Sequence, residues 1–356
     1  MEKGHVLVTG GAGFIGSHLV DQLLDLGYEV TILDCLVDQV HHDEKKDSEG
    51  WPLYLSKRAR RIKGDLSSED QFEKNLKGIT HLVHLAASVG VGQSMANIVD
   101  YTKNNTLSAA VMLQVLSKGN HSVKKIVTAS SMSVYGEGQY RTVTGHATFA
   151  PSLRNNKQLK EKKWELYHDD EILIPTPTTE EKPLMPASIY AINKRDHEEM
   201  FLVVGRALNI PTVALRLFNT YGSRQALSNP YTGVAAIFIS RLLKDLPPLV
   251  FEDGKQQRDF VHVSDVANAF ACVLENEAEV YDVFNVGSGS AVTIQQVAET
   301  LASIMNKKIA PIISNEYRIG DIRHCFADIK KIERVYGFKP QKSLSQGMME
   351  LINWVK

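Results

Sequence analysis

Short apolar runs alternate with amphipathic segments from the start of the chain to about residue 219. The apolar runs predict strands at 5–9, 28–33, 60–63, 79–86, 122–129 and 212–217. Helical periodicity predicts helices at 14–26, 94–117, 190–208, 264–275, 293–305 and 328–336. This alternation is typical of parallel sheets that helices cover on both faces. We therefore predict an α/β fold with a doubly wound parallel sheet.

Two polar stretches interrupt the alternation. Residues 38–58 are rich in charged side chains and are expected to form an exposed loop. Residues 137–187 combine a charged helical piece, Lys157 to Leu166, with a proline-rich exit. A structureless loop of that length is uncommon in a compact domain, so we expect local structure or a lid role. Because sheet signals resume afterwards, we interpret 137–187 as an insertion.

The pattern becomes irregular after about residue 219. Short strands are expected there among helices, at 249–251, 259–263 and 283–286. We interpret residues 219–356 as a smaller α/β substrate domain that closes over the sheet. The larger domain is expected at 1–218, with 258–280 returning to it. Two domains also agree with the length of 356 residues.

Composition and charge exclude several classes of protein. The chain has 40 Lys+Arg against 41 Asp+Glu, so it carries no basic footprint for nucleic acid. No apolar run is long enough to span a membrane, and a strand begins where a signal peptide would lie. The three cysteines and twelve histidines show no zinc-site spacing. We expect a cytoplasmic enzyme without a metal ion and without a nucleic-acid or membrane partner.

A glycine-rich segment follows the first strand and opens the first helix. Its glycines allow a tight turn and let backbone N–H groups approach a pyrophosphate at the positive end of the helix. The expected contacts are Gly10, Gly13, Phe14, Ile15 and Gly16. Asp34 ends the next strand, where a carboxylate binds ribose hydroxyls and repels a 2′-phosphate. The segment predicts a Rossmann-type NAD site; the alternative is a tight turn beside a solvated Asp34.

Two more strand ends are candidates for cofactor contacts. Asp65 and Leu66 follow the third strand, at the rim where an adenine would lie. The alternative is an ordinary turn capped by Asp65. The fourth strand ends in small residues that leave room for the cofactor backbone, namely Leu85, Ala86 and Ala87.

Tyr190 and Lys194 are the candidate catalytic pair. They are four residues apart and therefore share one helix face. A phenol with a pKa of about 10 needs nearby positive charge to act as a base, and Lys194 can supply that charge. Ser131 follows the strand at 122–129, where its hydroxyl can hydrogen-bond a reacting sugar oxygen. The alternatives are a surface pair and a serine-rich turn.

Together these motifs resemble the extended short-chain dehydrogenase/reductases, in particular the nucleotide-sugar epimerase/dehydratase group. The likeness continues through the segments 215–222, 258–263, 285–287 and 318–321. It implies NAD as cofactor, Tyr190 as acid/base, Lys194 as a ligand of the nicotinamide ribose and Ser131 as partner of the sugar oxygen. It also implies a cofactor contact at Asn104.

The resemblance further implies a nucleotide-diphosphate sugar as substrate. The residues implied to contact it are Ser131, Ser133, Asn219, Arg258, Arg318 and Arg323. A guanidinium suits this task because its planar fork pairs with phosphate oxygens. For Arg258 and Arg318 the alternative is a surface ion pair, and Arg323 lies outside the firmest motif.

Met132 and Ser133 indicate the reaction. The 4,6-dehydratases of this family resemble Thr-Asp-Glu at this point, because eliminating water needs an extra acid and base. Met132 and Ser133 supply neither group. The resemblance therefore implies 4-epimerisation by oxidation at C4, rotation of the 4-keto sugar and re-reduction. The alternatives are a 4-keto reductase, a 4,6-dehydratase and a catalytically silent NAD-binding regulator.

Some features depart from the family pattern. The segment after Asn104 lacks a common Asn-x-x-Gly-Thr, and the 137–187 insertion is absent from typical UDP-galactose 4-epimerases. The sequence looks closer to the subgroup called dTDP-L-rhamnose 4-epimerases, so both UDP and dTDP stay open. Family members dimerise through two helices per subunit, which makes 94–117 and 190–208 candidates for a homodimer interface.

Overall fold

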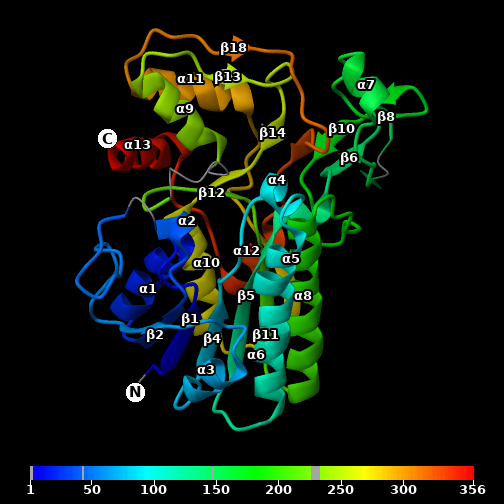
Figure 1. Cartoon of the computed structure of the whole chain (residues 1–356). Helices are drawn as coiled ribbons and strands as arrows, with labels where there is room; N and C mark the ends of the chain where they lie inside the picture. The colour runs from blue at the N-terminus through cyan, green and yellow to red at the C-terminus, as the bar shows by residue number, and fades with distance from the viewer. Residues whose placement is uncertain (1–2, 42–43, 146–147, 226–232) are drawn as a thin grey trace.

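The computed structural model describes residues 3–41, 44–145, 148–225 and 233–356. Its central sheet has seven parallel strands (Figure 1). From one edge to the other they are β16 (Tyr281–Val286), β11 (Thr212–Leu217), β5 (Lys125–Ser131), β4 (His81–His84), β1 (His5–Thr9), β2 (Glu29–Asp34) and β3 (Arg60–Lys63). The chain order reverses between β4 and β1, so the sheet is doubly wound and the predicted Rossmann-type fold is confirmed.

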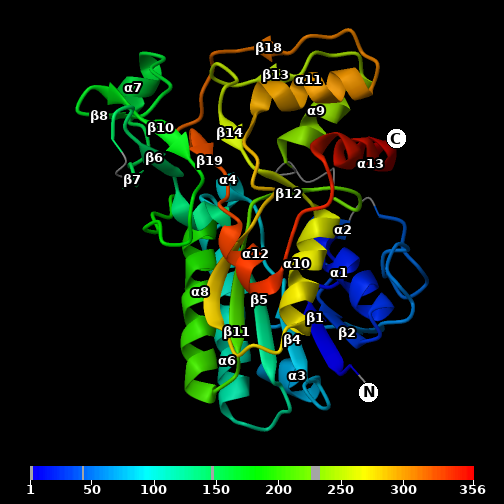
Figure 2. The ribbon, with the colours of Figure 1, turned by 180° about the vertical axis from the view of Figure 1, so that it is seen from behind.

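Helices cover both faces of the sheet because strand side chains alternate between the faces. On β1, Val6 and Val8 lie in one hydrophobic core and Leu7 lies in the other. The first core is completed by α1 (Phe14–Asp25), α10 (Val263–Glu275) and α12 (Lys330–Tyr336). The second is completed by α3 (Glu69–Lys74), α6 (Ser108–Ser117) and α8 (Ile189–Leu208). Figure 2 shows the first layer of helices from behind.

Two predicted elements differ from the structure. The helix expected at 94–117 is divided into α4 (Val91–Ser94), α5 (Ile98–Thr102), a π-helical turn (Lys103–Leu107) and α6. It is interrupted because Asn97 has a non-helical backbone, with ψ of 53°. The strand expected at 283–286 in the smaller domain is β16, at the edge of the main sheet. β16 joins the main sheet because α10, the helix that precedes it, packs against α1 and so brings the chain back to this sheet.

A separate hydrophobic core lies beyond the carboxyl ends of the sheet strands (Figure 1, top). It is formed by α9 (Val234–Leu243), α11 (Ile294–Ile304) and α13 (Leu344–Val355). The short strands of this part are β12 (Asn219–Tyr221), β13 (Leu249–Val250), β14 (Gln257–Arg258), β15 (Phe260–His262), β17 (Val292–Thr293), β18 (Ile312–Ile313) and β19 (His324–Cys325). The domain limits at 218 and 219 stay a prediction.

The polar stretch 38–58 is less exposed than expected. It begins with α2 (Asp38–His41) and then returns to the protein, where Trp51 and Leu55 are buried in the core that also contains α1. The Tyr54 hydroxyl donates to the Ala12 carbonyl at 2.9 Å. These apolar anchors hold the stretch against the glycine-rich loop.

The insertion at 137–187 is structured, apart from residues 146–147, which lie outside the described residues. Its three-stranded antiparallel sheet consists of β6 (Gln139–Arg141), β7 (Thr148–Phe149) and β10 (Ile174–Thr176). A hairpin joins β8 (Tyr167–His168) to β9 (Glu171–Ile172), and α7 spans Asn156–Lys160. The small core contains Tyr140, Leu166 and Leu173. The expected local structure is therefore present, although the helix is shorter than the charged piece predicted.

Candidate active site

The glycine-rich loop joins β1 to α1 by approaches that exclude side chains. Gly10 has a φ of +71°, and a Cβ there would lie 2.6 Å from the Ala86 nitrogen. A Cβ on Gly16 would lie 2.2 Å from the Gly10 carbonyl oxygen. Gly13 precedes α1 without a side-chain cap, so Phe14 and its neighbours Ile15 and Gly16 present backbone N–H groups at the positive end of the helix. This geometry suits a pyrophosphate.

Asp34 lies beside this loop at the end of β2. One carboxylate oxygen accepts the Ala12 N–H at 3.0 Å, and the other accepts the Leu36 N–H at 2.9 Å. The side chain is only partly buried, and each oxygen has a further lone pair. Asp34 therefore fixes the loop and is also in a position to accept from a ribose.

The predicted cofactor residues at the ends of β3 and β4 differ in their exposure. Asp65 is exposed, and its side chain accepts the Ser67 N–H at 2.8 Å, as in the capped turn that was the alternative. Leu66 is buried in the core around α6. Leu85, Ala86 and Ala87 are partly exposed directly after β4, opposite the glycine-rich loop.

Asn105 rather than Asn104 is the buried asparagine of the π-helical turn. Its side chain accepts the Ser88 N–H at 2.7 Å and donates to the Ser88 carbonyl at 3.1 Å. Asn104 is exposed and donates to the Ser88 hydroxyl at 3.1 Å. Both therefore support the loop after β4, and cofactor contact at Asn104 stays a prediction. π-Helical turns are frequent at functional sites.

Tyr190 and Lys194 lie in the first two turns of α8. The helix starts here because Ser188 caps it, accepting the Ala191 N–H at 3.1 Å. Lys194 is buried, and its Nζ donates to the Ala129 carbonyl in β5 at 2.8 Å. Ser131 ends that strand and accepts from the Ser133 hydroxyl at 3.0 Å. The structure therefore brings these four predicted residues together.

Burial controls the ionisation of this pair. It raises the pKa of Tyr190, and a hydrogen bond with Ser131 opposes that rise. Burial also lowers the pKa of Lys194 to about 8. Lys194 therefore carries its charge below about pH 8, where it can stabilise the Tyr190 phenolate.

Beneath Lys194 lie two buried histidines, His84 and His197, with ring centroids 5.2 Å apart. Burial lowers the pKa of both, and the Lys194 charge adds to the effect. His84 is held by the Thr9 hydroxyl at 2.8 Å. Both rings are neutral at pH 7, so Lys194 carries the positive charge among these three side chains.

Three predicted substrate residues lie at the part that contains α9 and α11. The buried Asn219 Oδ1 has no hydrogen-bond partner among the described residues. Arg258 Nη1 donates to the Gln257 and Arg323 carbonyls, each at 2.9 Å, and Nη2 donates to the Ile322 carbonyl at 2.7 Å. Arg318 is exposed, and its guanidinium lies 4.5 Å from the centre of the Phe251 ring.

Arg323 lies elsewhere than predicted. Its side chain is fully buried and pairs with Glu165 at 2.6 Å, Asp253 at 2.7 Å and Glu252 at 3.0 Å. Both Nη atoms donate to these carboxylates, and the buried Nε has no hydrogen-bond partner among the described residues, so no accessible edge is left for a phosphate. Its role in this structure is to join the insertion to the segment that follows β13, which corrects the substrate contact expected for it.

Several charged residues of this region were missed from the sequence. Arg154 and Glu252 form a buried bidentate ion pair at 2.8 and 2.9 Å. Arg216 pairs with Glu198 of α8, and the Arg216 Nη1 donates to the Tyr135 hydroxyl at 2.8 Å. The only signal in the sequence was charge inside apolar segments, because the partners are far apart along the chain.

The described ranges contain neither a helix long and apolar enough to cross a membrane nor a group of three His, Cys, Asp or Glu residues that could hold a metal ion.

The model of the NAD-dependent epimerase/dehydratase family matches residues 6–157 and 165–287. The dTDP-L-rhamnose 4-epimerase of Burkholderia thailandensis is 31% identical over 353 residues, which cover 98% of this chain and 94% of that protein.

Two solved structures are similar over almost the whole chain. The UDP-N-acetylglucosamine 4-epimerase from Methanobrevibacter ruminantium M1, in complex with UDP-N-acetylmuramic acid, has a TM-score of 0.79 and 30% identity, covering 99% of this chain and 98% of that one. The UDP-glucuronic acid 4-epimerase from Bacillus cereus, in complex with UDP-glucuronic acid and NAD, has a TM-score of 0.78 and 25% identity with the same coverage.

Proposed function

Because the chain belongs to the NAD-dependent epimerase/dehydratase family, we propose that it catalyses the 4-epimerisation of a nucleotide-diphosphate sugar. The observation that carries the proposal is the grouping of Tyr190, Lys194 and Ser131 at the end of β5. This group lies at the same edge of the sheet as the glycine-rich loop.

Each catalytic residue has a defined task in this reaction. Tyr190 takes the proton of the C4 hydroxyl and later returns it, while Ser131 hydrogen-bonds the same oxygen. Lys194 stabilises the phenolate by its charge and holds the nicotinamide ribose. NAD, when bound, accepts the C4 hydride and gives it back, so no net oxidation occurs. Gly10, Gly13, Gly16 and Asp34 would hold NAD.

The substrate diphosphate is assigned to Arg258 and Arg318. Arg258 uses three of its five N–H groups on backbone carbonyls, which leaves Nε–H and one Nη2–H along a single edge. Such an edge matches two phosphate oxygens. Asn219 and Ser133 complete the proposed substrate contacts, with UDP and dTDP as the candidate nucleotides.

Dehydration is disfavoured by the residues after Ser131. Met132 is buried, and the Ser133 hydroxyl donates to Ser131. Neither side chain is an acid or base suited to removing water from C5 and C6.

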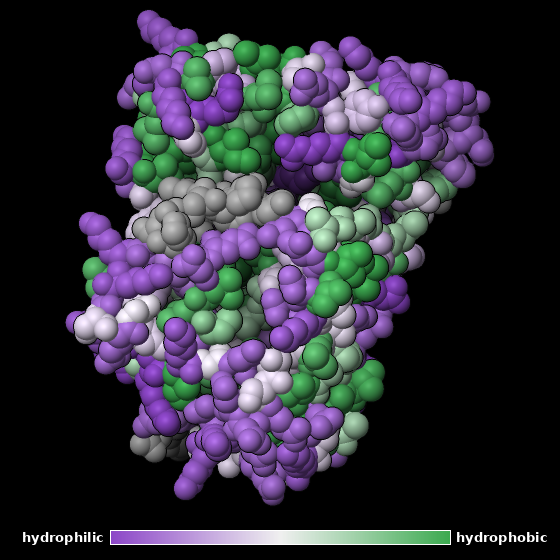
Figure 3. Space-filling view, in the orientation of Figure 1, coloured by the Kyte–Doolittle hydropathy of each residue, from purple (hydrophilic) through white to green (hydrophobic). Residues whose placement is uncertain are grey.

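We also propose that the enzyme is a cytoplasmic homodimer. α5 and α8 pack side by side and expose apolar side chains. Figure 3 shows hydrophobic side chains gathered over this region. The exposed residues are Ile98, Val99, Leu107, Ile192 and Val203, of which Val99 is 78% exposed. The expected result is a dimer by light scattering, and a monomer would contradict this part of the proposal.

The decisive experiment supplies a panel of UDP- and dTDP-sugars without added cofactor. A product of unchanged mass and new retention time supports epimerisation. Loss of one water would instead indicate a dehydratase, and a need for NADH would indicate a reductase. Tyr190→Phe should lower turnover by about 10²–10⁴-fold while NAD stays bound. Unchanged turnover in this variant would refute the role of Tyr190.

A further inference from the structure

The insertion at 137–187 is fastened to one segment, residues 321–328, along much of its length. At its start, the Gly138 N–H donates to the His324 carbonyl at 2.8 Å. Near its end, the Thr178 N–H donates to the Phe326 carbonyl, also at 2.8 Å. Figures 1 and 2 show the insertion beside β14 and β19. These two bonds attach both ends of the insertion to the same segment.

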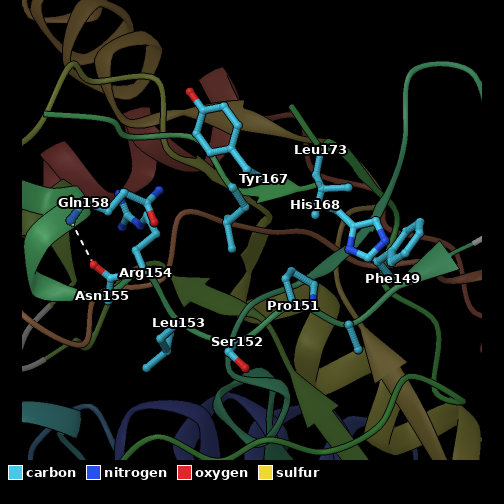
Figure 4. A pocket seen from close by; sticks show the side chains of 12 residues that line it. Phe149, Pro151, Ser152, Leu153, Arg154, Asn155, Gln158, Tyr167, His168 and Leu173 are labelled. Atoms are coloured by element: carbon cyan, nitrogen blue, oxygen red, sulfur yellow. Dashed lines mark hydrogen bonds between the residues drawn. The ribbon is translucent and has the colours of Figure 1, made fainter. Parts of the chain in front are cut away.

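Between these ends, Arg154 joins the insertion to the same segment. Its Nη2 donates to the Asp321 carbonyl at 3.0 Å, and its two Nη atoms pair with Glu252. Figure 4 shows Arg154 at a cavity of about 390 Å³, which is lined by residues of the insertion. Arg154 therefore links the insertion to the backbone of residues 321–328.

The insertion also contributes carboxylates to this segment: Glu137 accepts the Arg323 N–H at 2.7 Å, and Glu165 contacts two side chains. Glu165 accepts from Arg323 Nη2 at 2.6 Å and from His324 Nε2 at 3.0 Å. The His324 Nδ1 accepts the Gln257 N–H at 3.1 Å, so the ring proton is on Nε2 and donates to Glu165. The His324 ring therefore connects Glu165 to Gln257 of β14.

The same segment holds Arg258 in place. β14, which contains Arg258, pairs in parallel with β19. The carbonyls of Ile322 and Arg323 accept two of the three hydrogen bonds that the Arg258 Nη atoms donate to the backbone, and the Gln257 carbonyl accepts the third. A shift of residues 322–323 would therefore reorient the Arg258 guanidinium and its free edge.

We propose that the insertion positions the phosphate-binding edge of Arg258, and that it acts through Glu165 on Arg323 and His324. The inference rests on the proposed function, because that function assigns Arg258 to the substrate diphosphate. Glu165 is thus a positioning residue that does not touch the substrate itself. The insertion governs affinity for the nucleotide half of the substrate and leaves NAD binding alone.

The test measures binding of UDP and dTDP to the NAD-loaded enzyme by calorimetry. Glu165→Gln should weaken binding of the preferred nucleotide about tenfold, since small misplacements of a binding group are costly. NAD content should stay the same. Glu161→Gln is the matched control, because Glu161 lies in the same insertion and forms an exposed ion pair with Lys163. Equal affinity in wild type and Glu165→Gln would overturn the proposal.

A double variant separates positioning from a general structural effect. In the Arg258→Lys background the guanidinium edge is absent, so Glu165→Gln should cause little further loss. Independent, multiplying losses would overturn the proposal. If Glu165→Gln does not fold, Arg154→Lys tests the same link through the Asp321 carbonyl and should show the same loss.

The two proposals can fail separately. A wild-type enzyme that binds the nucleotide but epimerises no sugar in the panel contradicts the proposed function and leaves the positioning role standing. A wild-type enzyme that epimerises normally while Glu165→Gln binds nucleotide as well as wild type contradicts only the positioning role.

Discussion

The cofactor side and the substrate side of the candidate site are made of different chemical groups. At the glycine-rich loop, Gly10 and Gly16 contact backbone atoms so closely that no side chain fits. At the substrate side, Arg258 rests on a segment fixed by the buried ion pairs of Arg154 and Arg323. Backbone N–H groups are already rigid, whereas a long side chain must itself be held before it can bind with precision.

The largest expected effect tests the ion pairs. Arg323→Met removes the guanidinium that Glu165, Asp253 and Glu252 share. Glu252 keeps Arg154, but Glu165 and Asp253 lose this partner, so the free energy of unfolding should fall by about 3–5 kcal/mol. Arg58→Met is the control, since Arg58 and its partner Asp25 are 58% and 70% exposed and their pair should matter little. Urea denaturation followed by circular dichroism measures both. Equal losses in the two variants would remove the distinction drawn between buried and exposed charge.

Acid should weaken the same network. Burial alone raises the pKa of Glu165, but hydrogen bonds from His324 and Arg323 outweigh it and lower the pKa to about 2. Because the Glu165 side chain is 30% exposed, solvent screens part of this interaction, and the ionised carboxylate stabilises the fold only modestly. The contribution is complete above about pH 4.5 and is lost as the pH falls toward 2. The stability difference between wild type and Glu165→Gln should shrink over that interval; a constant difference from pH 7 to pH 3 would contradict the assignment.

The smallest expected effect concerns the cofactor side. A Cβ on Gly16 overlaps the Gly10 carbonyl, so Gly16→Ala must displace the loop at a cost of about 1–3 kcal/mol. NAD affinity should fall by about 10- to 100-fold, measured by fluorescence titration, while UDP and dTDP bind as before. Gly233→Ala is the control, because the nearest atom to its Cβ among the described residues would be a side-chain nitrogen of Gln225 at 3.7 Å. Loss of nucleotide affinity in Gly16→Ala would show that the two sides are not separate.

The fold was largely predictable because each strand of the main sheet is a local pattern. The strands at 5–9, 60–63 and 212–217 match those predicted, since apolar runs and their periodicity are visible in a single sequence. Prediction from the sequence fails where a contact between distant residues determines the structure. No residue near 283 indicates that β16 pairs with β11. The helix break at Asn97 depends on the backbone conformation of that one residue, which hydrophobic periodicity does not indicate.

The candidate site was predictable where the separation of residues along the chain determines their arrangement in space. Tyr190 and Lys194 share a helix face by their separation, and the glycines follow a strand. The error at Arg323 has a different origin. Its position beside a motif resembles that of a phosphate ligand, but its burial depends on Glu165 and Glu252, which come from separate parts of the chain. Such pairings of opposite charge cannot be read from one sequence.

The place of β16 at the edge of the sheet has a consequence for synthesis on the ribosome. The sheet stays incomplete until residue 286 has emerged, and the interval between the end of β11 and that point lasts about 3 to 14 s at ordinary elongation rates. During that time β11, a strand buried along its entire length in the finished protein, has one unpaired edge. Unpaired edges promote association between chains. We therefore expect nascent chains that end before residue 281 to need chaperone protection, although most of the fold has already been made.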